Sequence, residues 1–298
     1  MQIRKLGNML KDHKKAVVIS IIALFTAFCV LAAALVFHFV PESKYRIKSF
    51  FVTAFSSCKL TRVSYTQLDD YTLEELADDP RVTFDQSLML INPLHPLEKE
   101  AFLSIGEYKD STVYMNECVF GAYESLAKAV GDKYGTKLYV KSAYRTWQEQ
   151  EAEYAENPAA TLPGTSEHQA GLALDVYVPY HAGYAFIECE EGQFVASNGY
   201  EHGFIIRYPY YATEITGIGY EPWHIRYVGA PHAELITKNK LCLEEYVESL
   251  KKGVFYEYDR YTVTRQSCED GTLRLPNDFA SAVISPDNCG GYIVTLTR

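Results

Sequence analysis

Basic residues are scarce in this sequence. Lys and Arg total 28 against 38 Asp and Glu, and the formal net charge is −10 at pH 7. Nucleic-acid-binding proteins neutralise phosphates with a stripe of basic side chains, so this balance argues against nucleic acid as a partner. Hydrophobic residues make up 48% and charged residues 22% of the chain, which is typical of a globular rather than a disordered protein.

Cys-X-X-Cys motifs are absent, which argues against a zinc site built from cysteines. Of the seven cysteines, only Cys29 lies in the apolar N-terminal segment. The other six are an even number, so disulfides are possible outside the cell. Cys268 and Cys289 flank a turn-rich stretch, and we favour that pair.

One long hydrophobic run dominates the N-terminus. Residues 16–40 contain no Asp, Glu, Lys or Arg, and about 20 apolar residues suffice for a helix to cross a bilayer. Five basic residues precede the run: Arg4, Lys5, Lys11, Lys14 and Lys15. By the positive-inside rule, residues 1–15 are a cytoplasmic tail and the chain after residue 40 is extracellular. A cleaved signal peptide is the alternative, but its apolar core is usually about 7–15 residues long.

The remainder divides by pattern into a stalk (residues 41–58), a mixed domain (residues 59–252) and a small β-rich appendage (residues 253–298). Apolar residues at helical spacing predict a helix over residues 116–134, with Gly135 as its left-handed cap. A second helix is expected to stop before Pro158. Leu88–Ile91 is expected to be a buried strand. A helical tail is expected over Ala233–Lys251.

Two short motifs carry the chemistry: S-E-H-Q-A-G-L-A-L-D at 166–175 and E-P-W-H at 221–224. Catalytic zinc needs three protein ligands and one open position, and His168, Asp175 and His224 supply such a set. Asp175 lies in an apolar strand, where a carboxylate is costly unless it is paired or bound to a metal. Singly, His168 fits a loop histidine and Asp175 a strand-end cap, but together they favour a metal site.

Two further residues fit the same reaction. Glu221 precedes His224 by three residues, so it can lie beside the metal without binding it. It is the expected general base, taking a proton from water and passing it to the leaving amine. Arg145 is expected to stabilise the developing oxyanion.

A competing motif, Ser125-Leu126-Ala127-Lys128, matches the S-x-x-K of serine penicillin-binding enzymes. Neither S-D-N nor K-T-G, which those enzymes also need, occurs in the chain. We therefore interpret the match as chance.

The sequence resembles the VanY-like D-alanyl-D-alanine carboxypeptidases, part of the LAS-type zinc group with VanX-type dipeptidases and the Hedgehog signalling domain. The resemblance covers roughly residues 86–250. Its strings are S-A-Y-R-T-x4-E at 142–151, P-G-T-S-E-H-Q-A-G-L-A-L-D-V at 163–176, G-F-I-I-R-Y-P at 203–209 and T-G-I-G-Y-E-P-W-H-I-R-Y-V-G at 216–229.

The resemblance implies an α+β fold with a small antiparallel sheet flanked by helices. It implies Zn2+ bound by His168, Asp175 and His224, with Glu221 as base. It further implies that Arg145, Gln150 and Ser166 hold the substrate.

The implied substrate is the stem peptide of peptidoglycan, from which a carboxypeptidase removes the terminal D-Ala. Removal from a pentapeptide (D,D) is favoured over removal from a tetrapeptide (L,D), and both occur with this zinc signature. A non-catalytic, zinc-bearing wall-binding domain is the other alternative, against which Glu221 and Arg145 argue. The expected location is the cell membrane, with a single span and an extracellular catalytic domain; the oligomeric state stays open.

Overall fold

The structure is a computed structural model that describes residue 26, residues 58–157 and residues 160–298. The fold described below belongs to the unit of residues 52–298. The expected cytoplasmic tail, membrane helix (16–40) and stalk lie outside the described residues, except for Thr26 and Cys58. Within the described part, no helix combines the length and apolar character that a membrane span requires.

A four-stranded antiparallel sheet forms the centre of the part that resembles the peptidase family, roughly residues 86–250. Its order is β6-β7-β9-β8, with β6 (Tyr139–Ser142), β7 (Ala173–Tyr177), β8 (Phe204–Ile206) and β9 (His224–Tyr227). Most of β7 is buried because its residues read as a continuous apolar run interrupted only by Asp175. The small antiparallel sheet implied by the resemblance is therefore confirmed.

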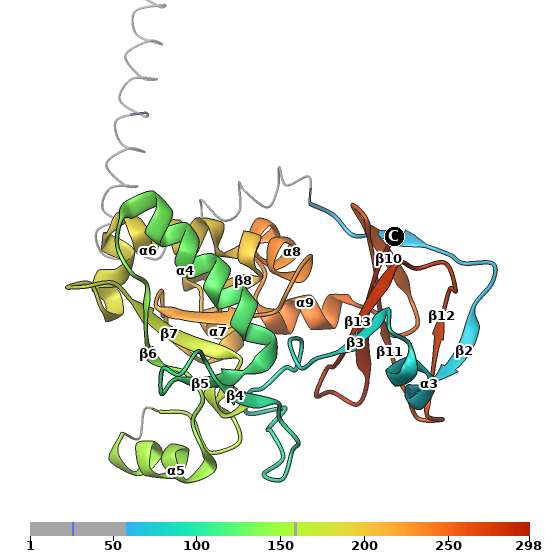
Figure 1. The fold of residues 1–298 in the computed structure, drawn as a ribbon, viewed down its shortest axis with the longest axis horizontal. Coiled ribbons are helices and arrows are strands. Elements are labelled where there is room, and N and C mark those ends of the chain that lie inside the picture. Colours follow the sequence, from blue (N-terminus) through green and yellow to red (C-terminus); the bar gives the residue numbers. More distant parts are fainter. Residues whose placement is uncertain (1–25, 27–57, 158–159) are drawn as a thin grey trace, which may run out of the picture. The chain divides into compact units, whose positions relative to one another are not determined.

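Helices cover this sheet (Figure 1). The helix α4 (Phe120–Tyr134) buries Tyr123, Leu126 and Val130 in one core with the sheet residues Leu174 and Ile225. It ends at Gly135, whose φ of 68° is left-handed as expected. The other helices of this part are α5 (Trp147–Glu156), α6 (Glu190–Asn198), α7 (Thr213–Thr216), α8 (His232–Asn239) and α9 (Leu243–Ser249).

The β-rich part contains strands from both ends of the described chain. Its six-stranded sheet has the order β1-β10-β11-β14-β13-β3. Figure 1 shows the blue and teal strands β2 and β3 beside the red strands β12 and β13. The strands are β1 (Thr61–Val63), β2 (Asp69–Thr72), β3 (Val82–Phe84), β10 (Phe255–Tyr258), β11 (Tyr261–Gln266), β12 (Thr272–Leu275), β13 (Ser281–Pro286) and β14 (Tyr292–Thr297).

This pairing differs from the expected boundaries. The sequence placed residues 59–84 in the zinc domain and only residues 253–298 in the appendage. In the structure β1, β2 and β3 pair with β10, β12 and β13, and the short helix α3 (Leu73–Asp78) lies between β2 and β3. Pairing between strands about 200 residues apart leaves no local pattern, so the sequence did not reveal it.

The expected strand at Leu88–Ile91 is wrong, although all four residues are buried. Their side chains alternate between two cores, as in a strand: Met89 and Ile91 enter one, Leu88 and Leu90 the other. The backbone of this stretch has no strand partner and is bonded in other ways. The carbonyls of Ser87 and Met89 accept hydrogen bonds from the Arg226 side chain, and the Leu90 N–H donates to the Asp287 carbonyl.

Two other expectations also need correction. The helical tail is broken into α8 and α9, because Lys240 adopts a left-handed conformation with φ 54°. The expected Cys268–Cys289 disulfide is not formed, and both residues carry free thiols. Cys268 packs against the core of β12 and β13, whereas Cys289 packs against the core that contains α8 and α9.

Candidate metal and catalytic site

Two neighbouring strands and one short turn bring the three expected ligands together. Asp175 on β7 is the direct cross-strand partner of His224 on β9. His168 lies in the 3-10 turn η2 (Glu167–Ala170), which ends at Gly171 with φ 65°. A side chain at Gly171 would come within 2.6 Å of the Asn116 backbone nitrogen, so only glycine permits this turn.

The three side chains fit a metal ion. One ligand atom from each lies within 4.8 Å of the others. His168 Nε2 is 3.5 Å from Asp175 Oδ2, and His224 Nδ1 is 3.1 Å from Asp175 Oδ1. Asp175 Oδ1 is buried without a hydrogen-bond partner. A buried carboxylate oxygen is energetically costly unless it is paired, and a bound cation would compensate that cost. The Ala143 carbonyl lies 2.7 Å from His168 Nδ1 and leaves Nε2 to face the site.

The charges of the site also suit a cation. Burial would raise the pKa of Asp175, but His168 and His224 hold it well below its usual range. Burial would lower the pKa of His224, yet Asp175 and Glu167 raise it to about 9. The site thus concentrates negative charge around two imidazoles, and a bound metal would replace the proton on a ligand nitrogen.

Glu221 lies beside the three ligands, as the sequence predicts. Its Oε2 is 3.6 Å from His224 Nδ1. Burial and the neighbouring Asp175 raise its pKa, against the opposing effect of His224. A raised pKa improves a carboxylate as a proton acceptor, as general base catalysis requires.

Arg145 faces the site from the start of α5. Its guanidinium donates to Gln150 Oε1 at 2.8 Å and to Ser142 Oγ at 3.3 Å. Gln150 is fully buried and donates in turn to the Thr161 carbonyl at 2.7 Å. The structure therefore places Gln150 behind Arg145, where it holds the guanidinium, whereas Ser166 lines the metal cavity itself.

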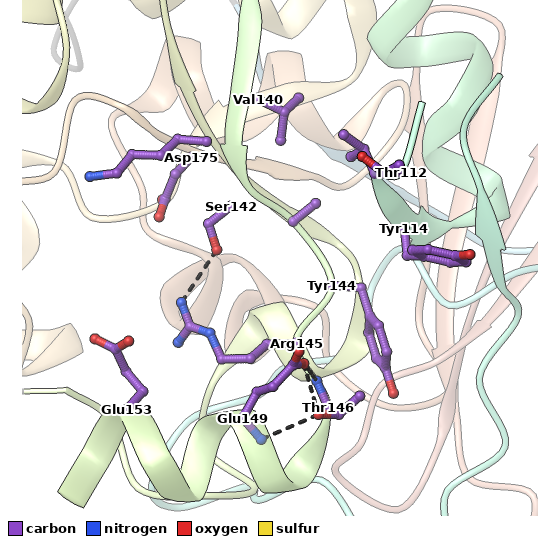
Figure 2. A pocket seen from close by; sticks show the side chains of 13 residues that line it. Thr112, Tyr114, Val140, Ser142, Tyr144, Arg145, Thr146, Glu149, Glu153 and Asp175 are labelled. Atoms are coloured by element: carbon purple, nitrogen blue, oxygen red, sulfur yellow. Dashed lines mark hydrogen bonds between the residues drawn. The ribbon is translucent and has the colours of Figure 1, made fainter. Parts of the chain in front are cut away.

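Two cavities meet at this site. A cavity of about 210 Å³ contains the three ligands, Glu221, Ser166 and Tyr208. A larger one, of about 870 Å³, runs along β6 and the start of α5, and Figure 2 shows Tyr114, Tyr144 and Arg145 around it. The two cavities share three lining residues: Arg145, Glu153 and Asp175. A ligand can therefore extend to both sides of the metal.

Sequence reasoning missed the charged residues behind the ligands. Glu167, Arg207 and Arg226 are almost completely buried. Arg207 Nε and an Arg226 terminal nitrogen donate to the same Glu167 oxygen at 2.7 and 2.6 Å. Arg207 also makes two hydrogen bonds to Glu244, at 2.9 and 2.6 Å. The signal was present, because Glu167 directly precedes His168 and Arg226 lies two residues after His224, on the same strand face.

The competing S-x-x-K motif does not form a catalytic site in the described structure. Ser125 is exposed on α4 and its hydroxyl lies 2.8 Å from His202 Nδ1. Lys128 forms an exposed ion pair with Asp132, one turn further along the helix. The two residues are thus engaged separately on the helix surface.

The fold and site define an α+β metallopeptidase with two candidate metal ligands on a small antiparallel sheet and the third in the short turn before it. Comparison with known proteins gives the family. The family model described as "VanY: D-alanyl-D-alanine carboxypeptidase" matches residues 112–230. A D-alanyl-D-alanine carboxypeptidase of Enterococcus faecium is 32% identical over 278 residues, covering 81% of this chain and 88% of that protein. This chain belongs to the VanY family of zinc metallopeptidases.

Solved structures agree on the fold. The vancomycin-resistance D,D-dipeptidase VanXYg, in complex with a D-Ala-D-Ala phosphinate analogue, superposes with a TM-score of 0.62 at 24% identity, over 79% of this chain and all of that one. The LD-carboxypeptidase LdcB superposes with a TM-score of 0.51 at 30% identity, over 65% of this chain and 95% of that one. The expected family is confirmed, and so is the α+β fold of the zinc domain; the N-terminal membrane helix stays a prediction.

Proposed function

We propose that this protein is a zinc-dependent D,D-carboxypeptidase that removes the terminal D-Ala from pentapeptide stems of peptidoglycan. The observation that carries the proposal is the set His168, Asp175 and His224, grouped within 4.8 Å with Glu221 beside it. Family membership supplies the substrate class, because the matched family and the Enterococcus faecium relative are both named for D-alanyl-D-alanine carboxypeptidase activity.

Each side chain has a role that follows from its position. A zinc ion held by His168, Asp175 and His224 would polarise the scissile carbonyl and make water more acidic. Glu221 accepts the proton of the attacking water and delivers it to the amine that leaves. Arg145 presents a fixed positive charge to the carbonyl oxygen as negative charge develops there.

The two cavities suit the two halves of a stem peptide. In this proposal the small cavity would hold the departing D-Ala, with the Ser166 hydroxyl in its lining as a donor to the terminal carboxylate. The large cavity is about four times as big and open along β6, so it accommodates the rest of the stem. Arg145 lies on the boundary of both, where the scissile bond of such a peptide would fall.

L,D-carboxypeptidase activity on tetrapeptide stems is the second candidate. It is favoured by the similarity to LdcB, which is described as an LD-carboxypeptidase. The two activities differ in the configuration of the residue before the scissile bond, which would lie against Arg145 and the β6 side of the cavity. The family match and the full-length relative favour D,D activity.

The proposed location is the outer face of the cell membrane, with the run at 16–40 as a single anchor. It is supported by the basic residues before that run and by the extracellular position of peptidoglycan. Protease treatment of intact cells tests it. An epitope tag fused to the C-terminus should be removed by the protease, whereas a tag fused to the N-terminus should be protected inside the cell.

Product analysis tests the activity. The purified full chain, supplied with zinc, should release D-Ala from a defined pentapeptide muropeptide and much more slowly from the tetrapeptide. A chelator should abolish release, and added zinc should restore it. Release from the tetrapeptide alone would replace the D,D assignment with L,D, and release from neither substrate would refute the proposal.

A further inference from the structure

A second carboxylate, Glu167, lies at the ring nitrogen of His224 that faces away from Asp175. Glu167 Oε2 is 3.8 Å from His224 Nε2. Both atoms are buried, and neither has a hydrogen-bond partner. The other Glu167 oxygen is fully used, because it accepts from Arg207 at 2.7 Å and from Arg226 at 2.6 Å.

We propose that Glu167 is a positioning residue that fixes the tautomer of His224 for metal binding; this inference rests on the proposed zinc site. A neutral imidazole carries one proton, and the nitrogen that binds a metal must be the one without it. The negative charge of Glu167 Oε2 faces Nε2 at 3.8 Å, so it favours the proton on that nitrogen and leaves Nδ1 free to face Asp175 and the metal. A carboxylate in this position also makes the imidazole a stronger ligand.

The surrounding contacts keep Glu167 in place. Arg226 also donates to the carbonyls of Ser87 and Met89, at 2.9 Å each. Arg207 is held on its other side by Glu244. Because both arginines are anchored elsewhere, they keep one Glu167 oxygen and leave the second aimed at His224.

The two histidine ligands are thus oriented by different acceptors. His168 uses the uncharged backbone carbonyl of Ala143, 2.7 Å from its Nδ1. A carbonyl has no hydrogen to donate, so it selects the tautomer of His168 without any charged partner. His224 relies on a side chain, which means that its tautomer depends on the residue at position 167.

The substitution Glu167→Gln tests the inference. The arginines would hold the single amide oxygen, so the amide NH2 would turn to His224 and donate to Nε2. That contact favours the tautomer with the proton on Nδ1, which cannot bind the metal. We expect zinc binding, measured on the full chain by competition with a chromophoric chelator, to weaken by about 10–100-fold.

Glu244→Gln is the matched control. It removes a carboxylate charge from the same arginine cluster, but the glutamine keeps an amide oxygen that accepts from Arg207, so this arginine stays anchored beside Glu167. The side chain of Glu244 bonds to Arg207 and Asn92 rather than to His224. Its zinc affinity should stay within twofold of wild type. NMR of zinc-bound, 15N-labelled protein should show the His224 proton on Nε2 in wild type and in Glu244→Gln.

The possible outcomes separate this inference from the proposed function. Equal zinc affinities for Glu167→Gln and Glu244→Gln would overturn the inference while leaving the zinc site intact. A wild-type chain that binds no zinc would overturn the proposed function instead. If Glu167→Gln does not fold, Glu167→Asp decides: it keeps the charge beside the arginines but withdraws it from Nε2, and unchanged zinc affinity there would contradict the inference.

Discussion

The two sheets bury different kinds of side chain. Around the four-stranded sheet, Glu167, Arg207, Arg226, His168 and His224 are all at least nine-tenths buried. The core beside the six-stranded sheet has the apolar residues Leu273, Ile284, Val294 and Leu296 at its centre, and most of the polar side chains that this sheet buries are uncharged, such as Thr262, Thr264 and Thr295. Buried charges rarely stabilise a protein compared with well-packed apolar residues. We therefore expect the buried charges around the four-stranded sheet to position reacting groups, and the apolar core beside the six-stranded sheet to contribute mainly to stability.

The sharpest separation of the two roles is Glu221→Gln. The charged Glu221 is the proposed general base, and its side chain is only partly buried, so its replacement should affect the reaction more than the stability. D-Ala release should fall by about 10²–10⁴-fold, the contribution expected of a general base. Zinc content and the unfolding midpoint in denaturant should match wild type; residual activity above a tenth of wild type would assign the base elsewhere.

Arg226→Met tests the cost of the buried charges. It leaves Glu167 with one arginine and removes the bonds to the carbonyls of Ser87 and Met89. The free energy of unfolding in urea should fall by about 3–5 kcal/mol.

Arg274→Met is the matched control for that variant. Arg274 pairs with Asp70 on the surface, where both side chains are about two-thirds exposed. A loss of at most about 1 kcal/mol is expected there. Equal losses at the two positions would contradict the expectation that burial sets the cost of breaking an ion pair.

Leu296→Ala should produce the opposite phenotype to Glu221→Gln. Leu296 is 1% exposed in the apolar core, and its truncation should cost about 2–5 kcal/mol of stability. D-Ala release per folded molecule should not change at a temperature where the variant is still folded. Val283→Ala, on a side chain 36% exposed in the same sheet, is the control and should cost much less. A lower kcat in folded Leu296→Ala would link the two sheets functionally.

A smaller effect is expected from pH at the contact between α8 and β14. His232 Nε2 lies 2.8 Å from Thr295 Oγ1, and its Nδ1 lies 2.7 Å from the Tyr246 hydroxyl. Burial lowers the pKa of His232 to about 3. The unfolded chain takes up this proton near pH 6.5, so the stabilisation is complete above that pH and decreases as the pH falls toward 3.

The expected slope from this one group is about 1.4 kcal/mol per pH unit below pH 6. Urea unfolding of chelator-treated wild type and His232→Gln between pH 7 and 4.5 measures it. The variant should show the shallower dependence, since glutamine does not titrate in this range. Parallel pH profiles would show that His232 is not the responsible group.

The sequence was most informative where a function requires particular residue types at a particular spacing. His168, Asp175, His224 and Glu221 were identified because a metal site needs those groups at that spacing, and the structure brings them together. The helix α4 and its Gly135 cap were also predictable, because both follow from local periodicity and backbone conformation.

Long-range pairing was not predictable in the same way. No local sequence pattern in residues 61–84 indicates that they pair with strands near the C-terminus. In the structure, however, β1 and β3 form the two edges of the six-stranded sheet. Glu167 was passed over because a glutamate in a polar loop is usually exposed. Its burial depends on Arg207, directly after β8, and on Arg226 in β9, both far from Glu167 in the sequence.

Zinc titration tests the central claim most directly. Zinc is added back in steps to chelator-stripped full-length protein, and bound zinc and D-Ala release from the pentapeptide are measured in the same samples. Release should rise in proportion to bound zinc and level off at one ion per chain, and Asp175→Asn should show neither tight binding nor release. Full release from the zinc-free protein, or one tightly bound zinc in Asp175→Asn, would contradict a metal centre built on His168, Asp175 and His224.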